Sequence, residues 1–83
     1  MTKIQVPLPD DFTFTQENAA KLAQLMSRFD ASVMIHDQNR TVNAKSLLGI
    51  LALAYMRPSS LEFQIDGTDE AEACYAAKAF FMP

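Results

Sequence analysis

Few residues of this chain have the chemistry of a reactive site. Cys74 is the single cysteine and His36 the single histidine. His36 precedes Asp37 in a polar stretch, and no further histidine, cysteine or carboxylate cluster accompanies it at the spacing of metal ligands. Asp10 and Asp11 are adjacent carboxylates, which is more typical of a solvated turn than of acid–base catalysis. The sequence therefore predicts no enzyme, no cofactor and no metal site.

The strongest chemical signal is a serine in front of an apolar run. Residues 42–53 read Val-Asn-Ala-Lys-Ser-Leu-Leu-Gly-Ile-Leu-Ala-Leu, and the serine is Ser46. A serine here is a good helix N-cap, because its hydroxyl accepts a hydrogen bond from a backbone N–H that the first turn leaves unpaired. We expect a helix from Leu47. A negative charge on Ser46 would lie at the positive end of that helix, which is a favourable place for it.

The apolar residues after Ser46 cover more of the helix than one core-facing stripe needs, so some of them should be exposed. They are Leu47, Leu48, Ile50, Leu51, Leu53, Ala54, Tyr55 and Met56. Two interpretations are open for this excess: tight packing in a small core, or a surface for a protein partner. The same choice, core or contact patch, applies to Phe12 and Phe14.

Composition and charge limit the class of protein. The 83 residues suffice for a single domain, residues 1–83, with 49% hydrophobic and 20% charged residues. A net charge of -3 with seven scattered Lys and Arg argues against binding to nucleic acid or to an anionic membrane. The sequence has neither the apolar core of a signal peptide nor an apolar run of membrane-spanning length. We expect a cytoplasmic protein with a reduced cysteine.

Hydrophobic periodicity predicts four strands and three helices in the order βαββαβα. Strands are expected at residues 3–8, 32–36, 41–43 and 61–65, and helices at 16–29, from 47 and from about 69. Pro7 lacks an N–H, which places the first strand at a sheet edge. Thr15 is the expected cap of the first helix, and Thr13 with Gln16 would also fit a capping box. Asn39 is a candidate for a left-handed conformation in the polar turn. The buried face of the last helix is expected to contain Ala73, Cys74, Ala77, Phe80 and Phe81.

With Ala44-Lys45-Ser46 and this order of elements in view, the chain resembles the HPr family of phosphocarriers of the sugar phosphotransferase system. The resemblance runs almost end to end and also rests on Gly49, Ala19-Ala20, and Gly67 with Asp69-Glu70. It implies an α+β open-faced β-sandwich, in which three helices cover one face of a four-stranded antiparallel sheet of order 1-4-2-3. In similar Gram-positive proteins the serine at this place is a regulatory phosphorylation site.

The family's defining segment, Gly-Leu-His-Thr-Arg-Pro-Ala, falls on residues 13–19 and is largely replaced. Thr15 stands in the place of the histidine, Glu17 in that of the arginine and Asn18 in that of the proline. The resemblance implies that the histidine carries the phosphoryl group at a helix N-terminus, where the arginine adds positive charge. Thr15 has no imidazole nitrogen, and Glu17 would repel the anion. We therefore expect no sugar phosphotransfer.

Two functional hypotheses remain. In the first, the protein is similar to the catabolite-repression HPr paralogue: an HPr kinase/phosphorylase modifies Ser46, and the modified helix docks on a LacI-type transcription regulator. In the second, the fold serves only as an interaction or scaffold domain, as a monomer or a homodimer. The intact Ala44-Lys45-Ser46 segment favours the first hypothesis, whereas Glu17 and the two phenylalanines favour the second. In both, the expected interaction surface comprises Phe14, Thr15, Leu47, Leu48, Leu51 and Tyr55.

Overall fold

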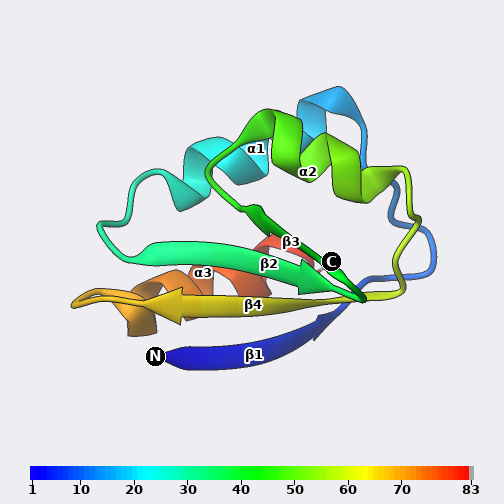
Figure 1. Ribbon diagram of the computed structural model, residues 1–83. Helices are drawn as coiled ribbons and strands as arrows, with labels where there is room; N and C mark the ends of the chain where they lie inside the picture. Colours follow the sequence, from blue (N-terminus) through cyan, green and yellow to red (C-terminus); the bar gives the residue numbers. More distant parts are fainter. Residues whose placement is uncertain (83) are drawn as a thin grey trace.

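The structure, a computed structural model, describes residues 1–82 and has the expected order of elements, βαββαβα (Figure 1). The strands are β1 (Thr2–Pro7), β2 (Ser32–Asp37), β3 (Arg40–Asn43) and β4 (Ser60–Asp66). The helices are α1 (Gln16–Met26), α2 (Leu47–Ala54) and α3 (Glu70–Phe80).

The four strands form one antiparallel sheet in the order β1-β4-β2-β3, as predicted. β1 and β3 are its edges, which confirms the edge position that Pro7 implied. Phe63 in the central strand β4 lies opposite Ile4 of β1 on one side and Ile35 of β2 on the other. Side chains alternate between the two faces of a strand, so one register places all three on the same face.

The core lies between that face and the helices. Leu61, Phe63 and Ile65 of β4 are buried, whereas Glu62 and Gln64 between them are only partly buried, which confirms the predicted alternation. The helices and β2 supply the remaining large buried side chains: Leu22, Met26, Val33, Ile35, Ile50 and Leu53. The structure is therefore the α+β open-faced sandwich expected from the sequence.

Helix α1 ends at Met26, so the prediction that it continues to Phe29 is wrong at this end. Ser27 is the C-cap, and its hydroxyl donates to the Ala23 carbonyl at 2.7 Å. The next two residues turn more tightly, because Arg28 N–H and Phe29 N–H bond to carbonyls three residues earlier. Phe29 still packs against the core, which explains why the apolar spacing outlasts the helix.

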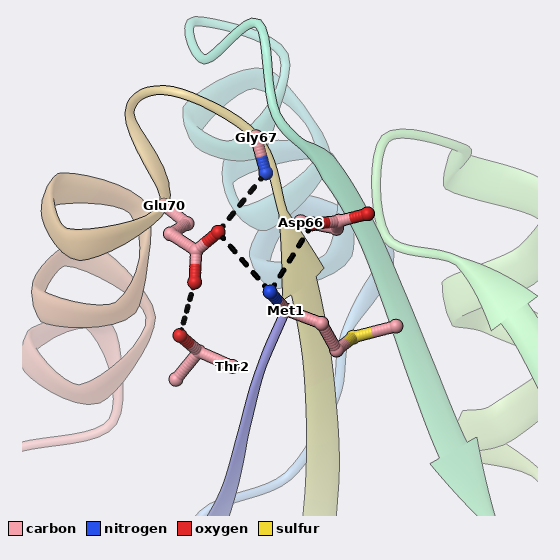
Figure 2. Close-up of polar contacts among 5 residues, drawn as sticks. All are labelled: Met1, Thr2, Asp66, Gly67 and Glu70. Carbon is pink, nitrogen blue, oxygen red and sulfur yellow. Dashed lines mark hydrogen bonds and ion pairs between the residues drawn. The ribbon is translucent and has the colours of Figure 1, made fainter.

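The start of α3 is fixed to β1 and to the turn that follows β4 (Figure 2). The Glu70 carboxylate accepts hydrogen bonds from the Thr2 hydroxyl and from Gly67 N–H, the latter at 3.2 Å. It also lies 3.5 Å from the Met1 amine, which is 3.2 Å from Asp66. These contacts, led by the Thr2 bond, lower the pKa of Glu70.

Two smaller predictions about turns and helix ends need correction. In the β2–β3 turn the residue with positive φ is Gln38 (55°), not Asn39. On α3, Ala73, Cys74 and Ala77 are buried as expected, but Phe80 is only half-buried, and the buried Phe81 lies at the cap beyond the helix end. Among the described residues, no helix is both long enough and apolar enough to span a bilayer.

Candidate functional site

Ser46 caps α2, as the sequence predicted. Its hydroxyl oxygen accepts a hydrogen bond from Gly49 N–H at 3.2 Å, and the residue is half-buried. The backbone before it is also fixed, because Ser46 N–H donates to the Asn43 carbonyl at 3.0 Å at the end of β3. Ser46 is thus held at the N-terminus of a helix, where unpaired N–H groups and the dipole favour an added negative charge.

Gly49 allows α2 to lie close to β3. A Cβ at this position would be 3.2 Å from Val42 Cβ and 3.3 Å from the Asn43 carbonyl oxygen, which is tighter than an ordinary contact. The glycine therefore sets the distance between the first turn of α2 and the strand that leads into Ser46.

The apolar residues of α2 divide into a buried and an exposed set. Ile50 and Leu53 are fully buried, and Leu47 and Leu51 are half-buried against the core. On the outer side, Leu48 is 79% exposed and Tyr55, at the C-cap, is 89% exposed. These two residues are seven apart and so lie along one side of the helix. Of the expected interaction surface, they are the members that present most apolar area to solvent.

Thr15 caps α1, again as predicted. Its hydroxyl oxygen accepts a hydrogen bond from Asn18 N–H at 3.0 Å, and the Asn18 side-chain amide donates to the Thr13 carbonyl at 2.9 Å. Glu17 points its carboxylate to Lys21, 3.3 Å away, in an exposed ion pair. The first turn of α1 is therefore closed by neutral groups and carries an acidic side chain.

Phe12 and Phe14 pack against the core while remaining half-buried. Their rings meet edge to face, with centroids 5.0 Å apart, and each contacts Phe81, at 5.2 and 6.1 Å respectively. Edge-to-face contacts of this kind stabilise aromatic clusters. Of the two interpretations, core packing therefore describes both residues better. Their contacts with Phe81 also fix the loop before Thr15 to the end of α3.

His36 is on the face of the sheet opposite to the helices. It is on β2 next to the buried Ile35, so its side chain projects from the opposite face of the sheet, which the helices do not cover. There its Nδ1 is 2.8 Å from the Thr41 hydroxyl on β3, and Glu62 lies opposite on β4. Among residues 1–82, no three histidine, cysteine or acidic side chains are close enough together to hold a metal ion.

Asp10, Asp11 and Cys74 have ordinary environments. The two aspartates are exposed in a turn that Phe12 N–H closes onto the Pro9 carbonyl at 2.9 Å. Burial raises the pKa of the Cys74 thiol, which keeps it protonated near neutral pH.

Two charged residues, Lys45 and Asp69, hold the loop between α1 and β2 through contacts that the sequence did not predict. The Lys45 ammonium donates to the Phe29 carbonyl at 2.7 Å. The Asp69 carboxylate accepts hydrogen bonds from Asp30 N–H and Ala31 N–H, both at 2.9 Å. The bond from Asp30 is the main cause that lowers the pKa of Asp69. No local pattern predicts these contacts, because each joins residues at least 16 positions apart.

The sequence matches known proteins over nearly its whole length. The family model described as the phosphotransferase-system HPr component phosphorylation site matches residues 6–82. The chain belongs to the HPr family. It is similar to the phosphocarrier protein HPr of Xylella fastidiosa, with 39% identity over 62 residues that make up 75% of this chain and 70% of the relative.

Solved structures of HPr-family proteins have the same fold. The HPr structure from Bacillus anthracis superposes with a TM-score of 0.87 and 31% identity, over 98% of this chain and 96% of that one. The catabolite-repression protein Crh of Bacillus subtilis, described as a domain-swapped dimer, superposes with a TM-score of 0.74 and 27% identity, over 98% and 93%. The family and the fold expected from the resemblance are thus confirmed.

Proposed function

We propose that this HPr-family chain is a non-enzymatic regulatory protein that acts through Ser46 and α2 by binding other proteins. The observation that carries the proposal is the position of Ser46: it caps a helix whose outer side exposes Leu48 and Tyr55. A modifying enzyme would find a hydroxyl at the helix N-terminus and apolar side chains beside it. A phosphoryl group there adds about -1.5 to -2 charge where the helix dipole favours it, so the surface changes while the fold is retained.

The first turn of α1 supports a role other than histidine-based phosphotransfer. Thr15, in the place that we assign to the family histidine, uses its hydroxyl to cap the helix. Glu17 follows with a negative charge that opposes an incoming phosphoryl group. His36, the single histidine, lies on the uncovered face of the sheet beside Thr41.

We infer two kinds of protein partner from this assignment, an HPr kinase/phosphorylase that modifies Ser46 and a LacI-type transcription regulator that binds the modified helix. The likeness to the catabolite-repression protein Crh supports a regulatory role of this kind. The expected contact surface combines the start of α1 with the exposed side of α2, and the cytoplasm is the compartment in which these partners would meet it.

The test is ATP-dependent labelling by a Gram-positive HPr kinase. We expect the wild type to be labelled and Ser46→Ala to remain unlabelled. Leu48→Ala should reduce the labelling rate about fivefold to tenfold, since an exposed apolar anchor is lost without disturbing the core. Tyr75→Ala is the matched control, because Tyr75 is 76% exposed on α3, away from Ser46, and its loss should leave the rate unchanged.

The labelling experiment also has an outcome that rejects the proposal. If a folded sample stays unlabelled while a genuine HPr control is labelled, Ser46 is only a structural cap. Equal losses in Leu48→Ala and Tyr75→Ala would show that the α2 surface has no special part in recognition.

A scaffold domain, as a monomer or a homodimer, is the second candidate function. β1 is an edge strand that pairs only with β4, and a loop containing Pro9 joins it to α1. Exchange of such a strand between two copies would form a domain-swapped dimer, and the similar protein Crh is described as a dimer of that kind. Light scattering across a concentration series tests the dimeric form of this alternative: a dimer in the unmodified protein would favour strand exchange, and a monomer throughout would reject it.

A further inference from the structure

The loop between α1 and β2 is held by charged side chains from two distant elements. Lys45, just before α2, donates to the Phe29 carbonyl at 2.7 Å. Asp69, just before α3, accepts from Asp30 N–H and Ala31 N–H at 2.9 Å each. Three consecutive backbone groups are thus fixed by one cation and one anion, and the Lys45 charge also helps to keep Asp69 ionised.

Lys45 is also the residue immediately before Ser46. Its backbone is fixed, because its N–H donates to the Asn43 side-chain oxygen at 2.9 Å. A cleft of about 330 Å³ lies beside it, between α1 and the start of α2. The residues that line this cleft are Ala20, Ala23, Gln24, Ser27, Lys45 and Leu47. The ammonium can therefore leave the Phe29 carbonyl without displacing core atoms.

We propose that Lys45 couples Ser46 to the loop of residues 27–31: a phosphoryl group on Ser46 draws the Lys45 ammonium away from the Phe29 carbonyl and loosens this loop. The inference rests on the proposed function, since it describes what modification of Ser46 does. An ammonium attracts a dianion on the neighbouring residue more strongly than it attracts a neutral carbonyl. Modification would then alter the end of α1 as well as the start of α2.

The test compares Ser46 and phosphoserine at position 46, each with Lys45 and with Lys45→Met. Phosphoserine is introduced during protein synthesis, so the result does not depend on any kinase. The readout is the carbonyl-carbon NMR shift of Phe29, which responds to loss of its hydrogen bond, together with amide hydrogen exchange at Asp30 and Ala31. Lys21→Met is the control for loss of a positive charge elsewhere on the surface.

We expect phosphoserine to move the Phe29 carbonyl shift most of the way to the value in Lys45→Met. Exchange at Asp30 and Ala31 should rise about tenfold, as for the loss of one charge-assisted hydrogen bond. In the Lys45→Met background phosphoserine should change neither quantity, and Lys21→Met should behave as the wild type.

An unchanged Phe29 shift on phosphorylation would overturn the coupling, as would a change of the same size in the Lys45→Met background. Failure of an HPr kinase to label Ser46 would instead reject the proposed function. The coupling experiment would be unaffected by that failure, so the two results are distinguishable.

Discussion

Thr15 caps a helix at the place that we assign to the family histidine. Its hydroxyl closes the first turn of α1 on Asn18 N–H, and the neighbouring Glu17 is paired with Lys21. A threonine phosphoester would also pass on its phosphoryl group less readily than a phosphoramidate. At the scale of the residue, the structure favours a helix cap and disfavours a carrier of phosphoryl groups.

This assignment predicts how phosphotransfer is restored. Thr15→His alone should accept little phosphoryl group from phosphoenolpyruvate and the first enzyme of the phosphotransferase system, because Glu17 still opposes the charge. Thr15→His with Glu17→Arg should accept more, and labelling assays measure the difference. Thr15→Asn with Glu17→Arg is the control, since asparagine keeps the cap but has no imidazole. Equal labelling of the single and double histidine variants would contradict the role given to Glu17.

Gly67 is a residue whose backbone excludes any side chain. Its φ is 156°, and a Cβ there would come within 2.6 Å of Ala31 Cα. Gly67→Ala should therefore cost about 3 kcal/mol of unfolding free energy, because the clash is with backbone. Gly49→Ala is the control: its Cβ would be 3.2 Å from the Val42 side chain and 3.3 Å from the Asn43 carbonyl oxygen, which is milder crowding that helix propensity partly offsets. Urea unfolding that finds Gly67→Ala no less stable than Gly49→Ala would contradict this account.

At the scale of elements, the starts of the helices follow from local chemistry and their ends do not. Thr15 and Ser46 predict where α1 and α2 begin, because a capping hydroxyl acts on N–H groups two or three residues away. The end of α1 is different. Phe29 continues the apolar spacing, but its backbone lies beyond the end of the helix, where Lys45 donates a hydrogen bond to its carbonyl.

Tertiary contacts also explain the other differences. Asp69 precedes α3 where a cap is expected, yet its carboxylate bonds to Asp30 and Ala31 and makes no cap bond to its own helix. In the β2–β3 turn, Gln38 has the positive φ, which is the first central position, as in a type II′ turn. Asparagine adopts positive φ more readily than glutamine, but Asn39 occupies the second central position of the turn, where φ is not positive.

Only part of the candidate site could be predicted from the sequence, because burial of its side chains also depends on tertiary contacts. An α2 that is apolar all round does not reveal which side is buried, and only packing against β3 and α1 separates buried Ile50 from exposed Leu48. The positions of Lys45 and Asp69 likewise depend on chain segments that meet only in the folded protein.

The bond between Asp69 and the α1–β2 loop predicts an acid-sensitive stability. The pKa of Asp69 is lowered in the folded state, so the unfolded state binds more protons as the pH falls. The stability that Asp69 contributes is present above its unfolded pKa of about 4 and is lost as the pH falls through the lower folded value. Asp69→Asn should be less stable at neutral pH, and its stability should fall less below about pH 4.

Chemical denaturation at a series of pH values checks this prediction. Asp10→Asn is the matched control, because Asp10 is an exposed carboxylate in a turn. The unfolding free energy of Asp10→Asn should change with pH in parallel with that of the wild type. Parallel curves for Asp69→Asn and the wild type would show that the carboxylate bonds contribute no acid sensitivity.

At the scale of the whole molecule, stability depends on one small core centred on β4. Phe63 is fully buried between Ile4 and Ile35, and its ring lies 6.2 Å from that of Phe81. Phe63→Ala should cost about 3–5 kcal/mol, a large share of the stability of a domain of this size. Phe80→Ala, at a half-buried position, should cost clearly less. If urea unfolding shows a loss below about 1 kcal/mol for Phe63→Ala, the assigned register is wrong.

The fold thus has the architecture of the HPr family, and we propose different roles for the N-termini of α1 and α2. At α1, Thr15 caps the helix and Glu17 adds a negative charge, so we expect no phosphoryl group to be carried there. At α2, Ser46 keeps a hydroxyl in a setting that suits a permanent or regulated negative charge. We propose that regulation at α2 has replaced phosphoryl transfer at α1.

Intact-mass spectrometry with site mapping tests that claim most directly. Two samples of the folded protein are compared, one incubated with phosphoenolpyruvate and the first phosphotransferase enzyme, the other with ATP and an HPr kinase. We predict no phosphoryl group in the first sample and one acid-stable phosphoryl group on Ser46 in the second. An acid-labile phosphoryl group on His36 in the first sample, or an unmodified Ser46 in the second, would contradict the account.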